Sequence, residues 1–142
     1  MIGRLNHVGI ATPSIERSAA LYRDVLGACR IHPTVIVPDQ GVAACFIDLP
    51  NTQLELIEPY GPDSPLTSFL SRHPLGGQHH LCFEVADLRA AVAELQRRGF
   101  DLLGQGVPRI GAHGWPIVFL HPRTMNGVLT ELMEQPKRPA EP

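Results

Sequence analysis

The chain has 142 residues, of which 44% are hydrophobic and 18% charged, as in an ordinary globular protein rather than a disordered one. Its net charge of −2 gives no reason to expect nucleic acid or a membrane surface as a partner, and no apolar run approaches the roughly 20 residues of a membrane span. Three cysteines without a Cys-x-x-Cys pair support neither a thiolate zinc site nor a redox motif. We therefore expect a protein of the reducing cytoplasm, with an organelle reached through a removed targeting peptide as the alternative.

The first half of the sequence predicts a strand, a helix and three strands. Residues 4–12 are typical of a strand, Ser14 then stands as a helix N-cap, and Gly27 is a helix stop. Apolar residues at helical spacing predict the buried face of that helix: Ile15, Ala19, Tyr22 and Leu26. Short apolar runs bounded by turn residues predict the strands: 34–37, 42–49 and 53–57.

The second half repeats this order after a turn-rich link at 58–65 and a short helix at 66–70. A strand is predicted at 79–85, and a helix runs from its N-cap Asp87 to Gly99. Three further strands follow: 101–103, 117–120 and 128–133. The sequence thus predicts one α+β domain over residues 1–135, built from tandem βαβββ repeats at about 1–73 and 76–135, with a loose tail at 136–142.

The two repeats share a pattern of histidine and glutamate. The segment Asn6-His7-Val8-Gly9-Ile10 is similar to His79-His80-Leu81-Cys82-Phe83, and Leu54-Glu55-Leu56 is similar to Thr130-Glu131-Leu132. Because successive side chains of a strand point to opposite faces, His80 is the partner of His7, and His79 is expected to have a structural or supporting role.

Two imidazoles and two carboxylates form the donor set of a mononuclear divalent metal site. The set suits Co²⁺, Mn²⁺, Ni²⁺, Zn²⁺ or Fe²⁺, and four protein ligands leave two octahedral positions for water or substrate. Carboxylates within apolar strands are costly to bury unless they are paired or bind a cation, which favours metal ligation by Glu55 and Glu131. The alternative is that the face carrying these glutamates is exposed to solvent.

These features resemble the vicinal oxygen chelate superfamily, and within it the methylmalonyl-CoA epimerase family. The motifs that carry the resemblance are Arg4-Leu5-Asn6-His7-Val8-Gly9-Ile10-Ala11, Asn51-Thr52-Gln53-Leu54-Glu55-Leu56, Asp63-Ser64-Pro65, Gly76-Gly77-Gln78-His79-His80, Ile110-Gly111-Ala112-His113-Gly114, Phe119-Leu120-His121-Pro122 and Gly127-Val128-Leu129-Thr130-Glu131-Leu132. The resemblance implies a glyoxalase-like fold, in which a curved β-sheet surrounds a metal cleft.

The resemblance also implies a site and a reaction. His7, Glu55, His80 and Glu131 would hold one divalent ion, with Co²⁺ as first choice, and Glu131 would also be the catalytic base. The substrate would be a small acyl-CoA, epimerised at C2 through a metal-stabilised enolate by a homodimer. Some family members carry a second glutamate where this chain has Ala44. The opposing acid–base group is therefore open between Glu55, bound water and another group.

Two other functions remain open at this point. One is a lactoylglutathione lyase-type activity of the same superfamily, which would use the same metal chemistry on a glutathione hemithioacetal. The other is a metal-free module of this fold that sequesters a drug or another small ligand. Proteins of that kind usually lack the metal ligands, so the intact set of histidines and glutamates counts against it.

Overall fold

The computed structural model describes residues 1–135, and the tail predicted at 136–142 lies outside the described residues. The chain divides into two compact units, which we call the first lobe (residues 6–80) and the second lobe (residues 1–5 and 81–135). Within each lobe four strands pair in a row, in the order β2-β3-β4-β1 in the first and β5-β8-β7-β6 in the second. Each lobe thus follows the βαβββ order that the sequence predicts.

The first lobe has one helix between its first two strands and another after its last. Its elements are β1 (Ile2–Ala11, which begins in the second lobe), α1 (Ile15–Asp24), β2 (Val35–Val37), a 3₁₀ turn η1 (Pro38–Gln40), β3 (Val42–Asp48), β4 (Gln53–Pro59) and α2 (Leu66–Arg72). Strand β4 runs parallel to β1 and antiparallel to β3, and β2 is antiparallel to β3. The crossover through α1 makes the parallel pairing of β1 and β4 possible.

Helix α1 begins as the sequence predicts and ends earlier. The Ser14 hydroxyl accepts a hydrogen bond from the Arg17 N–H, so Ser14 is the N-cap. The helix ends at Asp24, and the chain reverses at Gly27, whose φ is 75°. Leu26 therefore lies beyond the helix and is 67% exposed, so its prediction as part of the buried face was wrong.

The second lobe repeats the order with shorter strands. Its elements are β5 (Gly77–Val85, which begins in the first lobe), α3 (Leu88–Arg97), a 3₁₀ turn η2 (Leu103–Gly106), β6 (Arg109–Ile110), β7 (Pro116–Leu120), a 3₁₀ turn η3 (Pro122–Thr124) and β8 (Thr130–Glu134). Strand β8 is parallel to β5 and antiparallel to β7, and β6 is antiparallel to β7.

One predicted strand of the second lobe was wrong. At 101–103 only Leu102 makes a bridge, to Leu120, and the chain then turns through Gly104, Gln105 and Gly106, all with positive φ. That turn prevents an extended run, so the third strand of the repeat forms later, at β6.

A glutamate at the end of one strand supports the start of the helix in each lobe. The Glu58 carboxylate accepts a hydrogen bond of 2.9 Å from the Ile15 N–H, and the Glu134 carboxylate accepts one of 2.7 Å from the Leu88 N–H. A carboxylate at a helix N-terminus satisfies a backbone donor that has no partner within the helix, and it also favours the helix dipole. The internal repeat thus extends to the way in which each helix is attached to its sheet.

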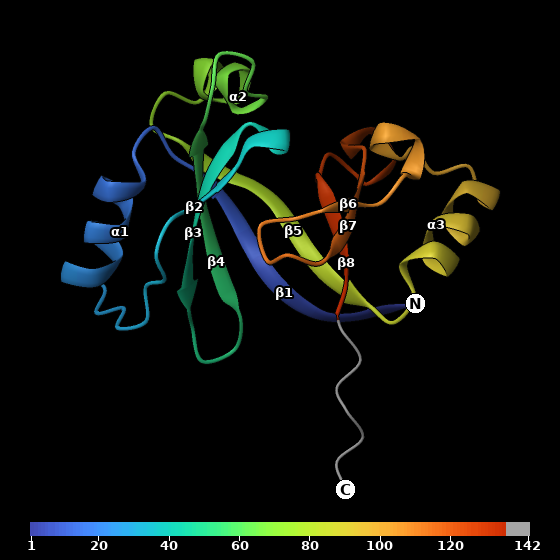
Figure 1. Ribbon diagram of the computed structural model, residues 1–142, viewed down its shortest axis with the longest axis horizontal. Helices are drawn as coiled ribbons and strands as arrows, with labels where there is room; N and C mark the ends of the chain where they lie inside the picture. Colours follow the sequence, from blue (N-terminus) through green and yellow to red (C-terminus); the bar gives the residue numbers. More distant parts are fainter. Residues whose placement is uncertain (136–142) are drawn as a thin grey trace, which may run out of the picture. The chain divides into compact units, whose positions relative to one another are not determined.

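Each sheet has a helix-covered face and an opposite face. In the first lobe α1 packs on one face of the sheet (Figure 1), and the buried cluster there is Ile15, Ala43, Cys45, Ile47 and Leu56. In the second lobe the cluster with α3 is Val85, Leu88, Ala91, Val92, Leu102, Val118, Leu120 and Leu132. Side-chain alternation places His7, Glu55 and Phe46 on the face of the first sheet opposite α1. Among the described residues, no helix is long and apolar enough to cross a membrane.

Candidate metal centre

His7 lies in the middle of β1 and is 1% exposed. Its Nδ1 is 2.8 Å from the side-chain oxygen of Asn6, and the backbone oxygen of Asn6 accepts a hydrogen bond of 2.9 Å from the Thr52 hydroxyl. An amide oxygen can only accept, so Nδ1 of His7 carries the proton. The lone pair of the neutral ring is then on Nε2, which makes that nitrogen available as a metal ligand.

His80 lies on β5 and brings its Nε2 to 3.2 Å from the Nε2 of His7. The two rings are nearly perpendicular, with centroids 5.3 Å apart, so they approach by their edges rather than by stacking. Both side chains are buried. Two buried ring nitrogens that face each other are stabilised by a proton or a cation, because two lone pairs alone would repel.

Glu55 lies on β4 and completes a group of three. One carboxylate oxygen is 3.5 Å from Nε2 of His7, and the other is 3.7 Å from Nε2 of His80. Ligands at about 2.1 Å from a shared ion lie about 3.0 Å apart at an angle of 90° and about 3.6 Å apart at 120°. The three separations in this structure therefore fit ligands of a single cation with little rearrangement.

His79 and α2 support His80 from the side. Although consecutive side chains leave a strand on opposite faces, Nδ1 of His79 lies 2.9 Å from Nδ1 of His80. The ring of His79 contacts the edge of Phe69 in α2, with centroids 5.1 Å apart, and Phe69 also packs on His73. A hydrogen bond to the second ring nitrogen is the usual means of fixing the orientation of a metal-binding histidine.

Strand β3 borders this group with apolar side chains. Phe46 is opposite Glu55 in the antiparallel register and contacts His7 edge-on, with ring centroids 5.9 Å apart. Ala44 lies two positions earlier on the same face and is fully buried. The position at which some family members have a second glutamate thus presents only a methyl group in this chain.

Glu131, the fourth predicted ligand, belongs to the second lobe. It lies on β8, is 5% exposed, and is opposite Cys82 of β5 and Phe119 of β7. The parallel register of Cys82 and Glu131 matches that of Gly9 and Glu55 in the first lobe. Glu131 is therefore the structural counterpart of Glu55, in agreement with the repeat in the sequence.

Sequence reasoning missed three residues that shape the group. Asn6 determines the tautomer of His7, Phe69 supports His79, and Gly9 shares the face of β1 with His7. Asn6 and Gly9 could have been found, since both lie within the repeated segment around His7. Phe69 could not, because its role depends on where α2 packs.

Two other ionisable side chains of the first lobe, those of Cys45 and Asp48, make hydrogen bonds within the lobe. Burial raises the pKa of the Cys45 thiol, which donates a hydrogen bond to the His32 carbonyl, so this cysteine is a weak nucleophile. The pKa of Asp48 is lowered, first by a hydrogen bond from Gln53 and then by His32, whose Nε2 is 3.0 Å away.

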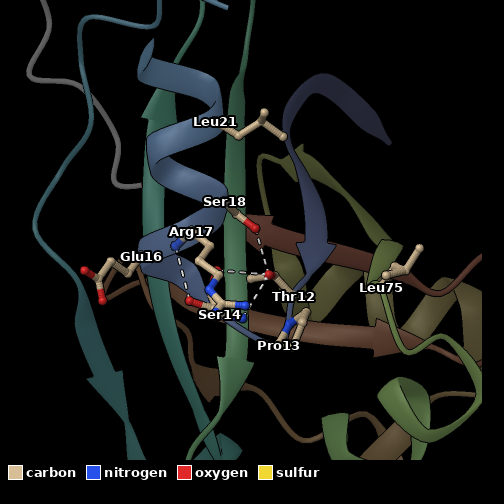
Figure 2. A pocket seen from close by; sticks show the side chains of 8 residues that line it. All are labelled: Thr12, Pro13, Ser14, Glu16, Arg17, Ser18, Leu21 and Leu75. Atoms are coloured by element: carbon tan, nitrogen blue, oxygen red, sulfur yellow. Dashed lines mark hydrogen bonds between the residues drawn. The ribbon is translucent and has the colours of Figure 1, made fainter. Parts of the chain in front are cut away.

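A separate open pocket of about 590 Å³ lies at the start of α1. Figure 2 shows hydrogen bonds among three of its residues: the Thr12 hydroxyl is 2.7 Å from that of Ser18 and accepts a hydrogen bond from the Ser14 N–H. The lining of the pocket includes one carboxylate, that of Glu16, and no histidine, so it offers no donor set comparable to the His7–Glu55–His80 group.

Comparison with known proteins identifies what the chain resembles. Residues 6–119 match the Glyoxalase/Bleomycin resistance protein/Dioxygenase superfamily. An ethylmalonyl-CoA/methylmalonyl-CoA epimerase of Cereibacter sphaeroides is 52% identical over 132 residues, which are 93% of this chain and 98% of that protein. The mitochondrial methylmalonyl-CoA epimerase of Homo sapiens is 47% identical over 131 residues, which are 92% of this chain and 73% of that protein.

Solved structures that are similar to this chain include methylmalonyl-CoA epimerases as well. The crystal structure of methylmalonyl-CoA epimerase from Mycobacterium tuberculosis has a TM-score of 0.87 and 30% identity, and the alignment covers 96% of this chain and 90% of that one. A methylmalonyl-CoA epimerase in complex with methylmalonyl-CoA and NH₄⁺ has a TM-score of 0.86 and 32% identity, with 95% and 96% of the two chains covered.

Proposed function

The chain belongs to the methylmalonyl-CoA epimerase family of the glyoxalase/bleomycin resistance protein/dioxygenase superfamily, and on that premise we propose that it interconverts the two C2 epimers of methylmalonyl-CoA. The observation that carries this proposal is the convergence of His7, Glu55 and His80 on one point in the first lobe. C2 of this substrate lies between a thioester and a carboxylate, so its proton is acidic, and the oxygens on both sides suit a hard cation.

We propose that one divalent cation, Co²⁺ before Mn²⁺, Ni²⁺ or Zn²⁺, is held by the Nε2 atoms of His7 and His80 and by the carboxylate of Glu55. The separations among these atoms and the tautomer of His7 support this assignment. Glu131 is proposed as the fourth ligand because its register in the second lobe repeats that of Glu55 in the first, and residues 1–135 are proposed as a single domain. When bound, such a cation would act as a Lewis acid that stabilises negative charge on the substrate oxygens.

Glu131 is also the residue that we propose as the base that takes the proton from C2. Glu131 is 5% exposed, and its register partners are Cys82 on β5 and Phe119 on β7. Carboxylates are among the side chains that act as general bases in enzymes. Ala44 has no proton to give, so a mechanism with a second glutamate at that position does not apply to this chain.

Ethylmalonyl-CoA is proposed as a second substrate. The relative from Cereibacter sphaeroides carries both substrates in its name and shares 52% of its residues with this chain over nearly its whole length. The two acyl groups differ by one methylene, which a hydrophobic pocket distinguishes by only about 1–3 kcal/mol. Comparing kcat/KM for the two thioesters tests this extension separately from the main proposal.

The main proposal is tested with protein loaded with Co²⁺ and a single epimer of methylmalonyl-CoA in D₂O. The expected result is conversion to the epimer mixture with deuterium at C2, because the proton that leaves is replaced from solvent. Absence of epimerisation with each of the four metals would contradict the proposal. Turnover of a glutathione hemithioacetal in that case would establish the lyase activity instead, and absence of bound metal would favour a binding module.

A further inference from the structure

We propose that Gly9 is a positioning residue, whose missing side chain makes the space in which the imidazole of His80 lies. This proposal rests on the proposed function, since it concerns how one of the proposed metal ligands is held in position. Gly9 is not a ligand, and its effect on the site acts through His80.

The geometry at Gly9 leaves no room for any side chain. A Cβ atom on Gly9 would be 2.1 Å from Cε1 of His80, 2.2 Å from Nδ1 and 2.6 Å from Nε2. Non-bonded carbon atoms prefer separations of about 3.5–4.0 Å, so even a methyl group would overlap the ring itself. The imidazole thus lies directly against the backbone of β1.

The place of Gly9 in β1 explains why the space is useful. Residues of a strand that are two positions apart share a face, so Gly9 lies on the same face as His7. In the parallel register Gly9 is opposite Glu55 on β4. The gap at Gly9 therefore lies beside both other donors, and a ring that fills it brings Nε2 to 3.2 Å from His7.

Backbone conformation does not account for the glycine. Gly9 is absent from the residues with positive φ, so its backbone conformation is one that other residues adopt. The repeat does not demand glycine either, because Cys82 occupies the matching position opposite Glu131 in the second lobe. Within the described residues, the contact that forbids a side chain at Gly9 is the ring of His80.

Substitution Gly9→Ala should consequently displace a ring rather than unfold a strand. The imidazole of His80 would have to turn away from the gap, and its Nε2 would then leave the point shared with His7 and Glu55. Residues that orient metal ligands typically change affinity by about 10–100-fold when they are altered. We expect Gly9→Ala to weaken Co²⁺ binding by roughly tenfold or more, measured by titration calorimetry.

Gly3→Ala is the matched control. Gly3 lies on the same strand, and a Cβ there would be 2.9 Å from the backbone oxygen of Glu84 in the second lobe. Both variants thus introduce into β1 a methyl group that overlaps an atom of another strand, but only the methyl group of Gly9→Ala overlaps a proposed ligand. We expect Gly3→Ala to lower the melting temperature and to keep the Co²⁺ affinity of the unsubstituted protein.

A double-mutant cycle on the metal-free protein tests the contact itself. Gly9→Ala should lower the melting temperature by about 5 °C in the unsubstituted background and should have no cost in a His80→Ala background, where the ring is gone. An equal cost in both backgrounds, or unchanged Co²⁺ affinity in Gly9→Ala, would overturn the inference. The cycle needs neither metal nor substrate, so failure of the proposed epimerase activity would not be mistaken for failure of this contact.

Discussion

The Nε2 atoms of His7 and His80 lie 3.2 Å apart, although the two residues are separated by 73 positions in the chain. A histidine within an apolar strand is ordinarily a hydrogen-bonded part of the core, and nothing in such a role requires two ring nitrogens to face each other. Here the Nδ1 atoms contact Asn6 and His79, which directs both Nε2 atoms toward one point. The carboxylate of Glu55 at the same point makes the group suitable for a cation.

His80→Ala should abolish metal binding and epimerase activity while the fold is retained. The substitution removes one of the proposed ligands, whose ring lies against Gly9 and contacts His79. Metal content after loading with Co²⁺ and far-ultraviolet circular dichroism check the two parts of this expectation. His32→Ala, which alters a histidine paired with Asp48, should keep its metal. Turnover retained in His80→Ala would count against the site.

Glu131→Gln should lower kcat by roughly 10³-fold, because it removes both a negative charge at the metal and the proposed base. Steady-state kinetics on methylmalonyl-CoA measures the effect. Glu134→Gln on the same strand is the control, since Glu134 accepts a hydrogen bond at the start of α3. That variant should lose stability but keep its rate, and equal rates in the two variants would remove Glu131 from the mechanism.

Asn6→Ala should weaken Co²⁺ binding by about tenfold, the lower end of the range for residues that orient metal ligands. Without the amide oxygen, Nδ1 of His7 is no longer fixed as the protonated nitrogen, so the ring adopts both tautomers. Titration calorimetry of this variant beside Asn51→Ala, an exposed loop position, provides the comparison. Equal affinities would show that the tautomer of His7 is determined by another contact.

The hydrogen bonds of Asp48 should make the stability of the protein depend on pH in the acid range. Hydrogen bonds from Gln53 and His32 lower the pKa of Asp48 in the folded protein below its ordinary value. A lowered folded-state pKa stabilises the protein above the unfolded-state pKa, and this contribution is lost as the pH falls through the folded-state pKa. The difference in melting temperature between the unsubstituted protein and Asp48→Asn should thus be largest above the unfolded-state pKa and should shrink as the pH falls below about 4. A constant difference would contradict this expectation, and Asp63→Asn serves as the control.

Local sequence patterns predicted most of the fold because caps and alternation act over a few residues. Ser14 and Asp87 both cap their helices as expected, since each side chain accepts a hydrogen bond from an N–H three residues later. The errors came where glycine turns override an apolar pattern. Helix α1 ended at Asp24, before Leu26, with the chain reversing at Gly27, and the turn at 104–106 replaced the strand expected at 101–103.

Internal repetition predicted the group of His7, Glu55 and His80, which the structure brings together. The repeat could not reveal how each ligand is held. The hydrogen bond of Asn6 to His7 and the gap at Gly9 depend on ring orientation across strands, which no spacing along the chain encodes. The role of Glu131 as ligand and base stays a prediction. Its register in β8 shows that it is the counterpart of Glu55, but register alone does not show metal binding or proton transfer.

Anomalous diffraction at the cobalt edge, from crystals grown with Co²⁺, tests the central claim most directly. The account predicts one strong peak bonded at about 2.1 Å to the Nε2 atoms of His7 and His80 and to the carboxylates of Glu55 and Glu131. A peak elsewhere, or none at these nitrogens in crystals that contain stoichiometric cobalt, would contradict it.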